Sequence, residues 1–170
     1  MRVQRFETFL AGLIRTGADQ PVRDMQTFAE AGFTGAGDHG LILTMGNGAR
    51  LYLNMVGSAP AGGDDHNQPE KIVEGEPPVP DGEPALQLQP DGRVRTVDVE
   101  TWLRALLLSS RSPEIREVRA YSRGEGSGFH PYGITVVFHR GDATHLYFLH
   151  TLPKGAEPWE ANRYQPLEAI

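Results

Sequence analysis

The sequence contains a long internal repeat. When the chain is shifted by 93 positions, residues 2–50 align with residues 95–143 without a gap. Nine of these 49 aligned pairs are identical, against about one in fifteen expected by chance for such a composition. The identical pairs are Arg2/Arg95, Glu7/Glu100, Thr8/Thr101, Leu10/Leu103, Leu13/Leu106, Arg23/Arg116, Gly35/Gly128, Gly40/Gly133 and Gly48/Gly141. Because the apolar positions coincide as well, we expect the same succession of elements to form twice.

Each copy opens with the pattern of an amphipathic helix. In residues 3–15 the apolar side chains recur at intervals of three and four positions, and residues 98–108 repeat that spacing. Such intervals place apolar side chains on one face of a helix. We therefore predict a helix at the start of both copies, with its apolar stripe turned toward the core.

Three strands are predicted after each helix. Residues 115–121 mix charged and apolar side chains in the manner of a strand, and the repeat requires the same structure for residues 22–28. Pro21 also suits the first turn of a helix, so the earlier segment alone leaves both structures open. The other four strands form two hairpins within residues 41–56 and 133–150.

Both hairpins are predicted to close through two-residue turns, at Asn47-Gly48 and Gly141-Asp142, because these residues tolerate the positive φ that a type I′ turn requires. Such turns would place Thr44 opposite Leu51 and Val137 opposite Leu146. The second hairpin would then be two residues longer, and its outgoing strand would correspond to the first at an offset of 95.

These elements predict an α+β fold. Two α-β-β-β halves, produced by an internal duplication, would share one antiparallel sheet with the helices packed on it, related by a pseudo-twofold axis. Neither half buries much apolar surface alone, so the chain is expected to be a single domain, residues 1–170. Its parts are the first repeat unit (1–60), a connector (61–92), the second repeat unit (93–153) and a C-terminal tail (154–170).

The composition limits the cellular compartment that we expect and the kinds of site that the chain can form. The absence of cysteine excludes structural disulfides, thiolate zinc sites and a cysteine nucleophile. No stretch has the features of a signal peptide or of a membrane span, so we expect a cytoplasmic protein without membrane contact. Arginine outnumbers lysine by 14 to 2, which is typical of a GC-rich bacterium or a phage of such a host.

The charge is concentrated in the connector. Residues 61–92 contain eight acids and one base, Lys71, so the net charge of this segment is −7. Because the net charge of the whole chain is −6, the remaining residues together carry +1. A segment so rich in Gly, Pro and acids buries little apolar surface and is expected to be mobile. The acids are Asp64, Asp65, Glu70, Glu74, Glu76, Asp81, Glu83 and Asp91.

A flexible anionic arm attracts basic surfaces. We expect the connector to contact a basic partner protein through its first five acids. Two alternatives stay open: the connector serves only as a tether, or it lies across arginines of its own chain. The five acids proposed for the partner contact are Asp64, Asp65, Glu70, Glu74 and Glu76.

The sequence offers little for catalysis. It has no HExxH, no G-x-S-x-G and no phosphate-binding loop, so we expect no metal and no cofactor. A metal-dependent hydrolase that uses Asp38 and His39 is the enzymatic alternative. Glu7 and Glu100, which the repeat relates, are interpreted as polar positions on solvated helix faces rather than as a catalytic pair.

A basic run offers another function. Arg111, Arg116, Arg119 and Arg123 surround Tyr121, a combination that suits phosphate pairing and base stacking. The acidic total charge argues against nucleic acid, which therefore stays an alternative. The favoured hypothesis is a non-enzymatic bacterial or phage accessory protein, such as an inhibitor, immunity-type or assembly protein. It would act through protein–protein contacts, and the repeated surfaces would also suit self-association.

Overall fold

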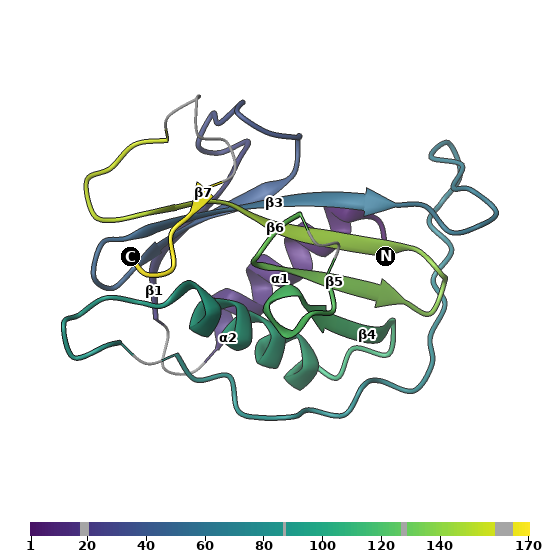
Figure 1. Cartoon of the computed structure of the whole chain (residues 1–170). Helices are drawn as coiled ribbons and strands as arrows, with labels where there is room; N and C mark the ends of the chain where they lie inside the picture. The colour runs from purple at the N-terminus through teal and green to yellow at the C-terminus, as the bar shows by residue number, and fades with distance from the viewer. Residues whose placement is uncertain (18–20, 87, 127–128, 159–164) are drawn as a thin grey trace.

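The computed structural model describes residues 1–17, 21–86, 88–126, 129–158 and 165–170 (Figure 1). Within them, two helices and seven strands follow one another along the chain. They are α1 (Val3–Thr16), β1 (Val22–Thr27), β2 (Gly40–Met45), β3 (Arg50–Ser58), α2 (Thr96–Ser109), β4 (Ile115–Ala120), the short 3-10 helix η1 (Tyr121–Arg123), β5 (Gly133–Phe138), β6 (Ala143–Leu152) and β7 (Gln165–Pro166).

The predicted α+β class is confirmed. Six strands form an antiparallel sheet in the order β1-β2-β3-β6-β5-β4, and the tail adds β7, which pairs in parallel with β6. The strand predictions for residues 22–28 and 115–121 are confirmed as β1 and β4. No helix among the described residues is long and apolar enough to cross a membrane.

The elements of the second half keep the spacing of the first. α2, β4 and β5 begin and end 93 residues after α1, β1 and β2. The irregularity in the pairing of β1 with β2, between Val22 and Asp24, recurs between Ile115 and Glu117 in the pairing of β4 with β5. A residue 93 positions after another is called its counterpart below.

The predicted two-residue turns are wrong. Thr44 pairs with Arg50 and Val137 with Ala143, because each hairpin closes through a three-residue loop. The third loop residue, Gly48 or Gly141, has a φ of 86° or 95°, as a three-residue hairpin loop requires. Since both loops have this length, the outgoing strands also correspond at an offset of 93 and not of 95.

One apolar core fills the space between the helices and the sheet. α1 contributes Phe6, Leu10 and Ile14, while the inner side chains of the strands meet them from the sheet. α2 is buried on a wider face than α1, including Trp102. The sheet therefore has an inner face covered by the two helices and an outer face on the other side.

Each helix is anchored to the sheet by a carboxylate. Glu7 on α1 accepts a hydrogen bond from the backbone N–H of Gly40 at 2.7 Å, and its counterpart Glu100 on α2 accepts one from Gly133 at the same distance. Glu100 is fully buried and also accepts from the N–H and hydroxyl of Ser122. The expected solvated helix face is therefore wrong for Glu100, because these backbone donors begin and end a loop and need an acceptor.

We predict that Glu100→Ala lowers the free energy of unfolding by about 3 kcal/mol, since it leaves two backbone donors without an acceptor. Glu100→Gln retains an acceptor and should cost about 1 kcal/mol. Glu7→Ala is the matched control, because it removes the acceptor of one backbone amide and should cost about 1 kcal/mol. Urea denaturation of the three variants measures these differences, and equal losses for Glu100→Ala and Glu7→Ala would contradict the anchoring role.

Candidate functional site

The outer face of the sheet is covered by the chain itself in the first half. Phe28 and Phe33, from the loop between β1 and β2, pack on Tyr52, and Phe33 also packs on His150. The Phe33 ring lies 5.0 Å from that of Tyr52 and meets His150 edge-on at 6.3 Å. Phe28, Tyr52 and His150 are buried as a result, so this half of the face is a small second core.

The counterparts in the second half are polar. Tyr121, Thr135 and His145 stand 93 residues after Phe28, Ile42 and Tyr52. Phe33 has a glycine, Gly126, as its counterpart. The same backbone positions that build an apolar cluster in one half therefore carry hydroxyls and an imidazole in the other, without the covering phenylalanine.

Three of these polar groups bond to one another. The Tyr121 hydroxyl lies 3.0 Å from Thr135 Oγ1, which lies 3.0 Å from Nδ1 of His145. Burial raises the pKa of Tyr121 to about 12, so the phenol keeps its proton at neutral pH. Burial also lowers the pKa of His145 from its ordinary value, so the imidazole is neutral at pH 7.

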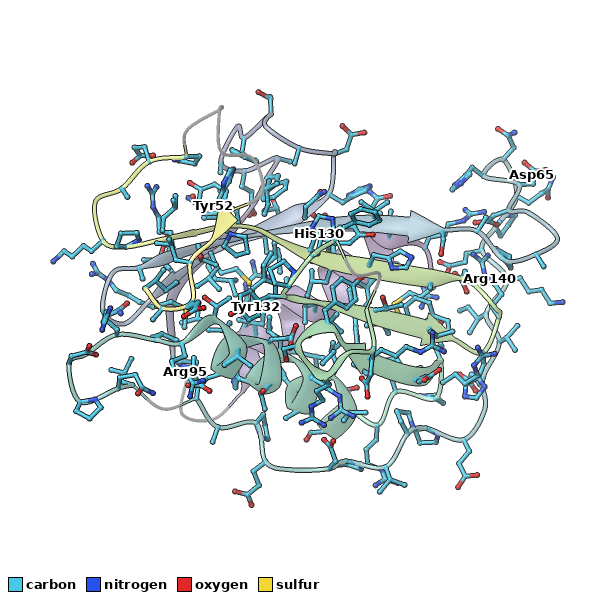
Figure 2. All side chains as sticks on the ribbon, in the orientation of Figure 1. Tyr52, Asp65, Arg95, His130, Tyr132 and Arg140 are labelled. Carbon is cyan, nitrogen blue, oxygen red and sulfur yellow. The ribbon has the colours of Figure 1, made fainter. Side chains whose placement is uncertain are left out.

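Two further rings extend this group across the outer face. Tyr147 stacks on His145, with ring centroids 5.9 Å apart and planes at 12°, and His130 lies 4.5 Å from Tyr147. Figure 2 shows His130 lying over the strands of the sheet. The neighbouring Phe129 is 92% exposed, the highest value among the exposed large hydrophobic residues described.

We call this group the ring patch. Its rings and hydroxyls are contributed by η1, the loop before β5, β5 itself and β6, and it is uncharged at neutral pH because burial lowers the pKa of His130 as well. Such a surface offers stacking and hydrogen bonding without charge. Its contacting members are Tyr121, His130, Thr135, His145 and Tyr147, and we include Phe129 as the chain neighbour of His130.

Asn54 lies beside the ring patch, opposite Tyr147 in the pairing of β3 with β6. It is 94% buried, and its side-chain oxygen has no hydrogen-bond partner among the described residues. Buried polar atoms without a partner are uncommon in folded proteins. The polar character of this half of the face therefore extends to the centre of the sheet.

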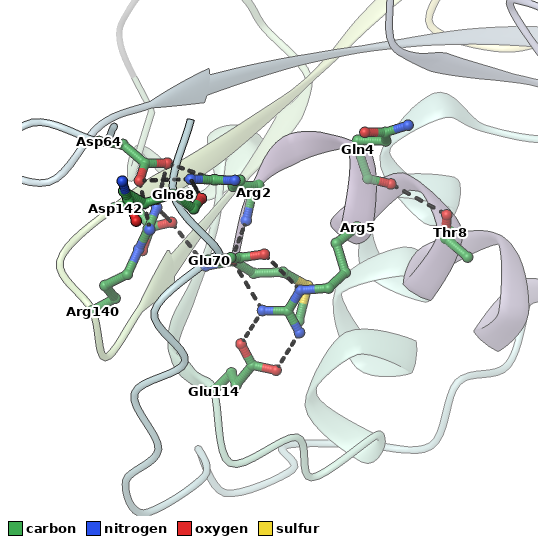
Figure 3. Close-up of polar contacts among 11 residues, drawn as sticks. Arg2, Gln4, Arg5, Thr8, Asp64, Gln68, Glu70, Glu114, Arg140 and Asp142 are labelled. Atoms are coloured by element: carbon green, nitrogen blue, oxygen red, sulfur yellow. Dashed lines mark hydrogen bonds and ion pairs between the residues drawn. The ribbon is translucent and has the colours of Figure 1, made fainter. Parts of the chain in front are cut away.

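The connector lies against the body at its acidic start. Figure 3 shows Asp64 held by Arg2 and Arg140, and Glu70 held by Arg5. Arg5 also pairs with Glu114, at 2.5 Å. The expected mobility does not describe this segment, because two of its acids are tied to arginines of its own chain.

Of the five acids predicted to contact a partner, only three are therefore exposed. Asp64 and Glu70 are about one-eighth exposed, whereas Asp65, Glu74 and Glu76 are exposed. Figure 2 shows Asp65 at the tip of a protruding loop. Beside the ion pairs, a cavity of about 240 Å³ is lined by residues of the N-terminus, β3 and β6 and by Asp64 and His66.

The arginines of the basic run do not form one cluster of free cations. Arg119 donates twice to Glu117, at 2.8 and 2.7 Å, and Arg123 pairs with Asp81 of the connector at 3.4 Å. The connector thus meets its own arginines here too. The remaining members, Arg111 and Arg116, are exposed.

The residues of the enzymatic alternative do not converge on a metal site. Asp38 is exposed, while Nδ1 of His39 lies 3.4 Å from Glu7 on the inner side of the loop. Among the described residues, no group of three or more His, Asp or Glu side chains has the arrangement of a metal site.

Comparisons with known proteins give no parallel: no family model, no curated protein and no solved structure matches this chain. The candidate site therefore rests on its own geometry. Sequence reasoning missed the ring patch, although aligning the two copies gave a signal. In that alignment Phe28 and Ile42 of the first copy correspond to Tyr121 and Thr135 of the second, which both carry a hydroxyl.

We predict that acid weakens the attachment of the connector. Hydrogen bonds from Arg2 and Arg140 lower the pKa of Asp64, and those from Arg5 lower the pKa of Glu70 to about 2. Because both pKa values are lower in the folded state, the stabilisation is complete above the unfolded pKa values of about 4 and is lost as the pH falls toward 2.

Urea denaturation between pH 6 and pH 2, in roughly unit steps, measures this effect. The double variant Asp64→Asn/Glu70→Gln should show a shallower fall of the free energy of unfolding with decreasing pH. Glu74→Gln, a change at an exposed acid of the same segment, is the matched control. An unchanged slope in the double variant would contradict the role of the ion pairs of Asp64 and Glu70.

Proposed function

We propose that this chain is a non-enzymatic accessory protein that binds another protein through the ring patch. The observation that carries this proposal is the difference between the two halves of the outer face. In the first half, Phe28 and Phe33 cover the sheet, whereas Tyr147 and His145 in the second half are only partly buried. Neutral surfaces rich in Tyr and His suit protein recognition, because rigid rings give contact area at low entropic cost.

We also propose that the fold arose by internal duplication and has a pseudo-twofold axis. Equal spacing of the elements, the recurring irregularity in β1 and β4, the two three-residue turns and the counterpart carboxylates support it. The pair Asn54–Tyr147 joins counterparts across the centre of the sheet, so the axis would pass through it. The ring patch would then begin at this axis.

The connector adds a second element to the proposal. Its exposed acids, Asp65, Glu74 and Glu76, would steer a partner with a basic rim toward the molecule, since charges outside a contact act on the association rate. The lack of cysteine and the arginine bias support a place in the cytoplasm of a bacterium or of a phage host. Inhibitors, immunity-type proteins and assembly proteins are the classes that fit.

We predict that Tyr147→Ala weakens partner binding by about tenfold or more, as expected for the loss of a central ring. Affinity capture from the native host, followed by mass spectrometry, identifies the partner, and titration of the purified pair gives the affinity. Val79→Ala is the matched control, because Val79 is an exposed apolar residue of the connector and not a member of the patch.

Two outcomes would contradict the proposal. Equal recovery of every partner by Tyr147→Ala and the parent chain would exclude the ring patch as the binding surface. Recovery of nucleic acid with an affinity that falls steeply with salt would favour the basic run instead. Replacing Asp65, Glu74 and Glu76 by their amides separates the contribution of the connector, and should slow association without abolishing binding.

A further inference from the structure

Phe129 presents its ring to solvent next to His130, a member of the ring patch. Ala36, the counterpart of Phe129, packs against the aromatic cluster of the first half. Phe129 instead extends into solvent with 92% of its surface exposed, next to His130 of the ring patch. A phenylalanine so exposed is costly in water, and it marks a contact surface when other rings adjoin it.

The first half shows how a phenylalanine fits such a site. Phe33 lies 5.0 Å from the Tyr52 ring and meets His150 edge-on. The ring patch offers the same pair of ring types, Tyr147 and His145, but the counterpart of the covering Phe33 is Gly126, and the ring packed on Tyr147 is that of His130. The occupant that this site fits is therefore an aromatic side chain.

The charges beside the patch are self-complementary. Glu117 and Arg119 lie on β4, at the positions paired with Val137 and Thr135, and each side chain is nearly half exposed. A twofold contact places the same surface on both chains, so a surface of one sign would repel its copy. Here Glu117 and Arg119 form an ion pair with each other beside uncharged rings, on a chain whose net charge is −6.

We propose that two copies of the chain associate through their ring patches, with Phe129 of each copy packed on the His145 and Tyr147 rings of the other. The Glu117–Arg119 ion pair of each copy would lie against that of its mate in the opposite direction, so that Glu117 also faces the mate's Arg119. The inference rests on the proposed function in taking the ring patch as the binding surface, and it names a second copy of the chain as the partner.

Sedimentation velocity of the full chain over a range of concentrations tests this. The parent chain should pass from monomer to dimer as the concentration rises, and Phe129→Ser should raise the dissociation constant at least about tenfold, as the loss of a central aromatic contact does. Val79→Ser, a similar change at another exposed apolar residue, should leave the dissociation constant unchanged.

A charge exchange makes the test independent of folding. Glu117→Arg alone and Arg119→Glu alone each create a patch of one sign, and each should weaken self-association at low salt. An equimolar mixture of these two variants should recover the dimer as a mixed pair, because each charge then meets its opposite. Recovery in the mixture also shows that both variants are folded.

Two results would overturn the inference. One is a parent chain that stays monomeric at every concentration, in which case a Tyr147→Ala loss of a captured protein would still support the ring patch as a binding surface for a different partner. The other is a dimer that Phe129→Ser leaves unchanged. If Phe129 closes on the rings of its own chain, the NMR signals of His145 and Tyr147 will respond to Phe129→Ser at all concentrations alike, with no dimer.

Discussion

The buried carboxylate of Glu100 is the interaction on which the candidate site depends. It accepts from Gly133, where β5 begins, and from Ser122, just after β4 ends. The loop that carries Phe129 and His130 runs between these two residues, so one side chain of α2 holds both ends of it. A carboxylate has several lone pairs, which lets it serve donors from two segments at once. Glu7 contacts the backbone N–H of Gly40 and the ring of His39, which both lie at one end of the corresponding loop.

The two anchored glycines explain why aromatic side chains reach the outer face. A Cβ on Gly133 would lie 2.8 Å from the Tyr121 ring and from the carbonyl of Leu146. Gly40 meets the Phe28 ring and the carbonyl of Leu53 in the same way. Only a glycine leaves room for a ring to cross the backbone at this point. The ring at the end of β1 or β4 is thereby carried over the start of the next strand, where it covers the face in one half and supports the hydroxyl contacts in the other.

The sequence allowed the elements to be predicted but not the site. The positions of α1, α2 and β4 follow from local sequence patterns, whereas β1 was predicted from its alignment with β4 in the repeat. The hairpin register was not predictable from Asn47-Gly48, because the same residues fit a two-residue turn and a three-residue loop that differ by one position. The role of Glu100 was hidden for another reason: polar residues on a helix are usually solvated, and its donors lie 22 and 33 positions away. The ring patch could not be predicted because its residues come from several segments. The ion pairs of the connector could not be predicted because only the fold brings its acids close to those arginines.

The outer face of the sheet differs between the two halves in how far its side chains are buried. In the first half Tyr52 and His150 lie under Phe28 and Phe33, which adds apolar burial to the stability of the domain. The second half forgoes that burial and retains hydroxyls, imidazoles and the Asn54 oxygen, which has no hydrogen-bond partner in the described part of the chain. Surfaces that sacrifice stability in this manner are typical of binding sites, because a contact made with a partner restores what the free chain lacks. Stability drawn from the inner core and the first half allows the second half to remain open.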